Sequence, residues 1–278
     1  MYSVNSDIFN TTNSNTNANT NANANANANN SIIDDTKYEV KNCVIINLDT
    51  RTDLWKSTEQ FRNKWTSYGK IVERIPGVSF KNKTHVVNDF IKSSRIKLDG
   101  RWFRQNKEEL LGEFGCYMGH YNCWKYVVDK KLDSCLILED GIIFLQQNFE
   151  NLSIDKNLDM LYINEEMTID AQNKIFTGYG LQGYVVTQKG AKKLLEKCES
   201  LFYPIDTQIR TLCNTKDVKG DVINIPFVKR NNNRISSIDG KQTDNTISDL
   251  NNKQNENTVI YRLLYNLLEK NVNLDDYI

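Results

Sequence analysis

The chain has 278 residues, and its 35 basic and 35 acidic side chains leave no formal net charge. This balance argues against a dedicated nucleic-acid-binding protein, whose binding surface would give the chain a basic excess. No stretch is long and apolar enough for a transmembrane helix, and the N-terminus lacks the charged start and apolar middle of a signal peptide. We therefore expect a cytoplasmic protein with no transmembrane segment, whose six scattered cysteines stay reduced.

Two asparagine-rich stretches divide the chain. Between Asn10 and Asn30 small polar residues and alanine nearly alternate, so nothing large and apolar is available for burial. We predict that residues 1–36 form a disordered arm. The second stretch, residues 231–257, is predicted to be a linker to a C-terminal helix and tail at residues 258–278. The intervening residues 37–230 have an ordinary composition and are long enough for a single domain with one core.

The domain opens with a strand, a helix and a second strand. The apolar, β-branched run Cys43–Ile46 is typical of a strand that is buried on both faces. Apolar residues then recur every three or four positions from Leu54 to Tyr68, which predicts a helix that Gly69 ends. The second strand is expected at Ile71–Ile75. This order is the βαβ unit on which nucleotide-binding sheets are built.

Strands and helices continue to alternate in the second half of the domain. Helices are expected from Gly115 to Lys130 and around Ala191–Cys198. Strands are expected at Cys135–Leu138, Met160–Ile163, Tyr184–Val186 and Val222–Val228, the last interrupted by Pro226 and therefore placed at a sheet edge. The pattern predicts an α/β fold, with a mostly parallel sheet and helices on both faces. Ligands bind such sheets outside the carboxyl ends of the strands.

Polar residues follow several of these strands. Glu139 and Asp140 end an apolar strand, and this pair is either a site for a hard divalent cation or an ordinary solvated junction. In the first turn, the guanidinium of Arg51 suits a diphosphate, whereas Asp53 also suits a helix cap. The turn after the first strand contains no glycine, so it has neither a GxGxxG nor a GxxxxGK[ST] phosphate loop, and the chain has no GxSxG motif. Nicotinamide dehydrogenases, P-loop ATPases and α/β serine hydrolases are therefore disfavoured.

His120 has three interpretations. It lies between Cys116 and Cys123 on one predicted helix, and together they could supply three zinc ligands, although the sequence shows no fourth. It could equally be a packing residue of the core. The third possibility is a neutral hydrogen-bond donor to a phosphate or a sugar hydroxyl.

Five segments, in order, resemble blocks of glycosyltransferase family 25, the lipopolysaccharide-type and collagen-type galactosyltransferases. They are IINLDTRTD from Ile45, GEFGCYMGH from Gly112, LILEDG from Leu136, GYVVTQKGAKKLL from Gly183 and PID from Pro204. The resemblance spans residues 43 to about 228 and implies a GT-A-like fold. It also implies inverting transfer of a hexose, galactose or glucose, from a UDP-sugar to a hydroxyl of a glycan or protein acceptor.

The resemblance also implies roles for individual residues. The metal and diphosphate position, for Mn²⁺ or Mg²⁺, falls on Glu139 and Asp140. The nucleotide-binding turn and the donor surroundings fall on Asn47, Leu48, Arg51, Asp53, Glu113 and His120. Inverting transfer requires a general base for the acceptor hydroxyl. The candidates are Asp206, on the acceptor side, and Glu165 and Glu166, and the sequence does not choose among them.

Gly141 is the most consequential departure from the family pattern, because an acid stands there in the family. Either the remaining carboxylates hold the ion, or basic side chains neutralise the leaving UDP. The same departure motivates an alternative function, that of a catalytically silent relative that binds sugar or protein.

Overall fold

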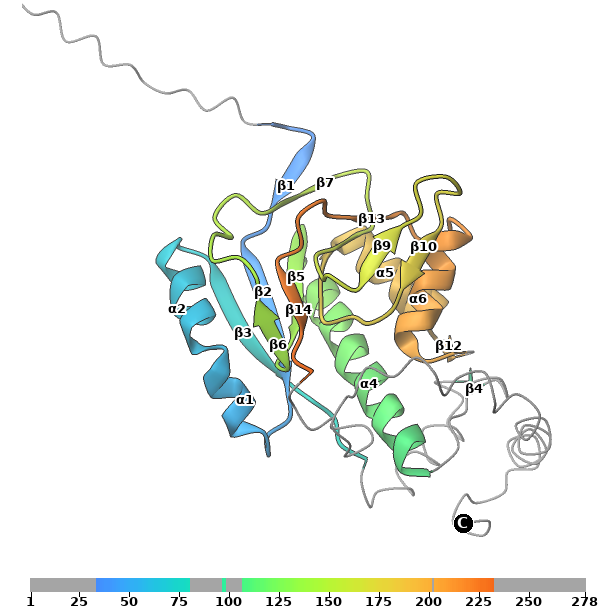
Figure 1. The fold of residues 1–278 in the computed structure, drawn as a ribbon, viewed down its shortest axis with the longest axis horizontal. Coiled ribbons are helices and arrows are strands. Elements are labelled where there is room, and N and C mark those ends of the chain that lie inside the picture. The colour runs from blue at the N-terminus through green and yellow to red at the C-terminus, as the bar shows by residue number, and fades with distance from the viewer. Residues whose placement is uncertain (1–33, 81–96, 99–106, 202, 233–278) are drawn as a thin grey trace, which may run out of the picture. The chain divides into compact units, whose positions relative to one another are not determined.

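The computed structural model describes residues 34–80, 97–98, 107–201 and 203–232 (Figure 1). The predicted N-terminal arm lies outside them except for its last three residues. So do the C-terminal helix and all but the first two residues of the predicted linker. None of the described helices is long and apolar enough to cross a membrane.

The described part of the chain has a central six-stranded sheet, in the order β13–β8–β11–β5–β2–β3. These strands are β2 Asn42–Asn47, β3 Ile71–Pro76, β5 Ser134–Glu139, β8 Met160–Tyr162, β11 Gly183–Thr187 and β13 Gly220–Val222. Within this sheet only β11 runs antiparallel to its neighbours. The predicted mostly parallel sheet is confirmed, and the carboxyl ends of the other five strands meet at one edge.

Helices cover both faces of the sheet, as predicted. They are α1 Thr52–Ser57, α2 Glu59–Ser67, α4 Lys107–Asp129, α5 Gln188–Lys197 and α6 Ile205–Asn214 (Figure 1). Successive residues of a strand point to opposite faces of the sheet. Val44 and Ile137 pack in one core cluster with residues of α4, α5 and α6, whereas Ile45 and Leu138 pack in a second cluster with α2.

The predicted βαβ unit is present, but its helix is divided in two at Thr58. The Thr58 hydroxyl donates to the carbonyl of Trp55 at 2.8 Å, and the Thr58 amide reaches the same oxygen at 3.3 Å. This local bonding competes with regular helical bonding, so α1 ends and α2 begins here. Gly69, with a φ of +71°, follows α2 in the left-handed conformation that ends many helices.

The prediction of one strand over Val222–Val228 is wrong. β13 ends at Val222, and Val228 begins a separate strand, β14 Val228–Arg230, which pairs with β6 Ile142–Phe144. Pro226 has no N–H to donate to a strand ladder. β14 runs alongside the segment that follows Asp140, and the Asn231 amide donates to the Gly141 carbonyl at 3.2 Å.

The described residues also form four two-stranded sheets, including β6–β14. The other three pair β1 Lys37–Glu39 with β7 Ser153–Asp155, β9 Met167–Ile169 with β10 Phe176–Gly178, and β4 Lys97–Leu98 with β12 Ser200–Leu201. Strands of two or three residues are too short to show a periodicity, so the sequence pattern did not predict them.

Trp65 anchors α2 on the sheet. Its side chain is fully buried against Phe61 and Phe149, and its indole N–H donates to the Ile71 carbonyl at 2.8 Å. We expect Trp65→Ala to lower the free energy of unfolding by about 3–5 kcal/mol in urea titrations, because it leaves a cavity and removes the hydrogen bond to Ile71. Replacing the exposed Asn63 on the same helix with alanine should change it by less than about 0.5 kcal/mol. Equal effects of the two substitutions would contradict this role.

Candidate active site

Four buried polar side chains gather at the carboxyl edge of the sheet. Asn47 ends β2, Asp140 follows β5, Asn164 lies just beyond β8, and Gln182 precedes the antiparallel strand β11. The strand order places these ends side by side, although the residues are far apart in the sequence. Buried polar groups require partners, so their hydrogen bonds define the site.

Asn47 makes three hydrogen bonds, one of them to Asp140. Its side-chain amide donates to Asp140 Oδ2 at 2.6 Å and to the Arg51 carbonyl at 2.9 Å, while its Oδ1 accepts from Arg74 Nε at 2.8 Å. Arg74 also pairs with Asp49 at 2.8 Å. Asp140 is only 8% exposed, so its carboxylate is fixed beside the end of β2. The structure thus brings the predicted residues Asn47 and Asp140 together.

Sequence reasoning missed Arg74. It lies on β3, which pairs with β2, but its contact with Asn47 depends on which two strands are neighbours. The available signal was the adjacent charged pair Glu73 and Arg74 in a strand whose other residues are apolar, because buried charged groups need partners.

The turn after β2 places the other predicted nucleotide-binding residues. Leu48 is half-buried, and Arg51 and Asp53 form an ion pair at 3.1 Å near the surface. The hydrogen bond from Arg51 lowers the pKa of Asp53. The interpretation of Asp53 as the helix cap is wrong, because α1 begins at Thr52 and Asp53 lies within its first turn. A negative charge there still interacts favourably with the helix dipole.

Glu139 and Asp140 point to different neighbours. Glu139 Oε1 lies 3.4 Å from His120 Nε2, whereas Asp140 bonds Asn47. Successive residues of a strand alternate between faces, which separates the two acids. These two contacts do not test the joint metal site of both carboxylates, which stays a prediction.

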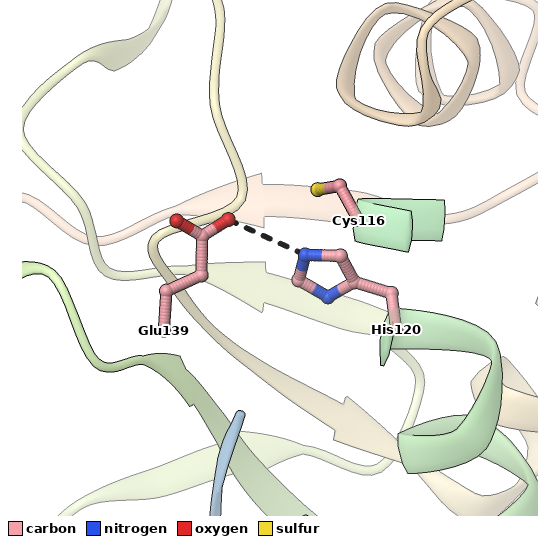
Figure 2. A group of neighbouring side chains, drawn as sticks. All are labelled: Cys116, His120 and Glu139. Carbon is pink, nitrogen blue, oxygen red and sulfur yellow. Dashed lines mark hydrogen bonds and ion pairs between the residues drawn. The ribbon is translucent and has the colours of Figure 1, made fainter. Parts of the chain in front are cut away.

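His120 lies on α4 and is fully buried. Besides Glu139, it contacts Tyr184. Its Nδ1 lies 3.1 Å from the Tyr184 hydroxyl, which accepts a hydrogen bond from Trp124 Nε1 at 2.8 Å. Cys116 lies one turn before His120, and its sulfur, the His120 ring and a Glu139 oxygen all lie within 4.8 Å of one another (Figure 2). The third member of this group is Glu139 and not Cys123, which is buried in the core.

Glu113 is also on α4, about two turns before His120. Glu113 is 4% exposed and is therefore buried. The same helix carries Cys116 and His120. Glu113 and His120 therefore lie on one helix, and their placement near the donor, which the resemblance implied, stays a prediction.

The three candidate bases lie in separate surroundings. Asp206, in the first turn of α6, accepts from the Gly180 amide at 3.0 Å and from the Thr207 amide at 2.6 Å. Glu166 Oε1 accepts from the Arg230 amide at 2.8 Å, and its other carboxylate oxygen is buried. Glu165, just beyond β8, is exposed.

Arg230 is a second residue that the sequence did not reveal. The amide oxygen of Gln182, turned toward it, accepts from Arg230 Nε at 3.0 Å and from Nη2 at 2.7 Å. The guanidinium also lies 5.6 Å from the ring centre of Tyr179. β14 pairs the backbone of Arg230 with that of Ile142, the residue after Gly141, while its guanidinium contacts Gln182 and Tyr179. The wrong prediction of one strand over residues 222–228 gave no indication that Arg230 lies on a separate strand beside β6.

Cys116 differs from the other cysteines. It is half-buried, whereas the remaining five are buried, and burial raises the pKa of Cys198 and Cys213 to about 12. Because the thiolate is the reactive form, we expect iodoacetamide to alkylate Cys116 first in the native, metal-free protein. Peptide mass spectrometry after brief labelling measures the order. Earlier alkylation of Cys198 or Cys213 would contradict the described burial.

Comparison with known proteins identifies the family. The model of glycosyltransferase family 25 (LPS biosynthesis protein) matches residues 40–178, which are 139 of the 278 residues. The match includes Asn47, His120, Glu139 and Asp140.

Curated relatives agree with this match. Procollagen galactosyltransferase 1 of Danio rerio is 29% identical over 136 residues, which cover 41% of this chain and 22% of that protein. Glycosyltransferase 25 family members of Aedes aegypti and Drosophila melanogaster are 26% and 35% identical over 198 and 184 residues. These two alignments cover 64% and 58% of this chain, and 32% and 28% of those proteins, so the chain spans about a third of their length or less. Because the family model matches half of the chain, including the buried pair at the sheet edge, this chain belongs to glycosyltransferase family 25.

Proposed function

We propose that this chain transfers a hexose from a UDP-sugar to a hydroxyl of a glycan or protein acceptor, with inversion at the sugar. The observation that carries the proposal is the buried Asn47–Asp140 pair at the carboxyl edge of a mostly parallel sheet, inside the region that matches the family. Galactose is the first sugar to test, because one of the relatives is named as a procollagen galactosyltransferase. Glucose is the second. A GT-A-like fold is part of this proposal.

A divalent ion fits this edge through one carboxylate. Mn²⁺ or Mg²⁺ prefers oxygen ligands, and Mg²⁺ commonly uses one or two carboxylates together with substrate phosphates and water. Asp140 is in place for this role, whereas Glu139 is directed toward His120 and Gly141 offers no side chain. When bound, the ion would offset negative charge on the diphosphate.

Arginines supply further positive charge in our proposal. The Arg230 guanidinium is held by the buried Gln182 at the carboxyl edge of the sheet, and Arg51 lies in the turn after β2. Guanidinium groups match the geometry of phosphate oxygens. With Gly141 in place of an acid, Arg230 is our candidate for stabilising the leaving UDP.

Glu165 is the base that we favour. In the reaction, the acceptor oxygen bonds the anomeric carbon while the bond from that carbon to the UDP oxygen breaks, and the hydroxyl proton passes to a carboxylate. Asp206 already accepts two backbone hydrogen bonds, and Glu166 is tied to the Arg230 amide. Glu165 is exposed beyond the carboxyl end of β8. Because β8 lies two strands from β5 in the sheet, the end of β8 is roughly 10 Å from the end of β5, which Asp140 follows.

Calorimetric titration of the full chain tests the donor class. UDP should bind more tightly than UMP, because the diphosphate adds charge contacts with Arg230 and Asp140-bound metal, and more tightly than GDP. The titrations are made with Mn²⁺, with Mg²⁺ and with chelator. Equal binding of UDP, UMP and GDP under all three conditions would overturn the proposed site.

Because Gly141 replaces an acid of the family pattern, we consider a second candidate function: a catalytically silent relative that binds sugar or protein without turnover. For such a protein, Gly141→Asp would leave sugar-nucleotide binding intact, and no donor would release UDP above background. Release of UDP from a panel of UDP-sugars, with acceptors supplied, separates the two functions.

A further inference from the structure

Three side chains of different chemistry converge between α4 and the end of β5. Cys116 and His120 are four residues apart on α4 and therefore project from the same helix face. Glu139 is the last residue of β5 and approaches from the sheet (Figure 2). A sulfur, a ring nitrogen and a carboxylate oxygen lie within 4.8 Å of one another. From this arrangement we propose that Cys116, His120 and Glu139 form a Zn²⁺-binding site.

The distance between His120 and Glu139 is long for a hydrogen bond and suits two ligands of one zinc ion. His120 Nε2 and Glu139 Oε1 are 3.4 Å apart, whereas such hydrogen bonds are usually about 2.7–3.2 Å long. Two ligands about 2.0–2.1 Å from one tetrahedral ion are separated by roughly 3.3–3.4 Å. The nitrogen and the oxygen therefore stand at the spacing that a shared zinc requires.

The surroundings of His120 orient it as a metal ligand. Tyr184, fixed by Trp124, contacts Nδ1, so Nε2 is the nitrogen directed to Glu139. Histidine ligands of metals characteristically donate the second ring N–H to a fixed acceptor, a role that the Tyr184 oxygen fills. The ring is fully buried and packs against the Trp124 side chain, which restricts its rotation.

The ligand types select the ion. Thiolate and imidazole suit Zn²⁺, whereas Mg²⁺ and Ca²⁺ prefer oxygen ligands alone. Three protein ligands leave a fourth position open for water or a ligand. Both Cys116 and Glu139 keep partial exposure, so an ion can enter. Asp140, our candidate ligand for Mn²⁺ or Mg²⁺, is not in this group, and the zinc site does not depend on the proposed transfer reaction.

Metal binding by the full chain tests the proposal without any activity assay. After treatment with chelator, the protein is incubated with Zn²⁺, passed through a desalting column and analysed by native mass spectrometry and elemental analysis. We expect one retained Zn²⁺ per chain. Substituted Co²⁺ should show a sulfur-to-cobalt charge-transfer band and the intense visible absorption of four-coordinate cobalt.

Two sets of variants make the test specific. Cys116→Ala should abolish the charge-transfer band, and both this variant and Glu139→Gln should weaken Zn²⁺ binding by at least roughly 100-fold. The controls are Cys123→Ala, on the same helix, and Cys198→Ala, since both thiols are buried elsewhere in the core and should leave binding unchanged. The proposal is overturned if the parent chain retains no Zn²⁺, if Cys116→Ala binds it equally well, or if both controls lower binding as much as Cys116→Ala.

Discussion

Asp140→Asn should lower kcat for sugar transfer by about 10²–10³-fold, the loss typical of removing one fixed electrostatic group from an active site. The variant is nearly isosteric, and its amide oxygen can still accept the hydrogen bond from Asn47 that holds the native side chain. What disappears is the negative charge that we propose as the ligand of the divalent ion. Initial rates of UDP release, together with a thermal unfolding curve, measure the two effects separately.

The matched control for Asp140 is Asp129→Asn. Asp129 is exposed at the end of α4 and pairs only with the nearby Lys125 among the interactions described for it. This substitution should change kcat by less than about 2-fold, since an exposed pair one turn apart contributes little. If Asp140→Asn retained full activity with an unchanged unfolding curve, Asp140 would have no part in the reaction.

Glu165→Gln should reduce kcat by about 10²–10⁴-fold, the range expected when a general base is removed. Glu165 is exposed, so the change should leave the thermal midpoint where it is. The comparison variant is Asp206→Asn. Because Asp206 accepts the Gly180 and Thr207 amides, this second change should mainly lower the thermal midpoint.

Single-turnover kinetics at saturating donor report the chemical step for both variants. A large loss in the chemical step for Asp206→Asn, with Glu165→Gln unaffected, would reverse the assignment and make Asp206 the base. Comparable losses in the chemical step would show that both carboxylates act in the reaction.

The sequence predicted those parts of the fold that have strong local patterns. The apolar runs at Cys43–Ile46 and Cys135–Leu138 are strands, and Gly69 ends a helix, because burial and backbone freedom act on neighbouring residues. The antiparallel direction of β11 had no local signal, since a buried strand has the same composition in either direction. Nor did the three-residue strand β14, which determines where Arg230 lies.

The candidate site was predicted by residue type but not by contact. Asn47 and Asp140 were both expected at the sheet edge, yet the bond between them exists only because β2 and β5 are neighbours. The same holds for Arg74. Glu139 and Asp140 were expected to act together, but the alternation along β5 directs them to different partners. Non-local strand pairing, which no window of sequence contains, decided the contacts of Asn47 with Asp140 and Arg74. The separation of Glu139 from Asp140 follows instead from the local alternation along a strand.

The most direct test of the proposed function is release of UDP by the purified full chain from a panel of UDP-sugars, with glycan and protein acceptors supplied. Each reaction is run with Mn²⁺, with Mg²⁺ and with chelator, and Asp140→Asn serves as the inactive reference. We predict that one donor, UDP-galactose or UDP-glucose, is consumed by the native chain and not by the variant. Binding of UDP without release of UDP from any donor and acceptor pair would contradict the proposed transfer and support a silent, sugar-binding or protein-binding member of the family.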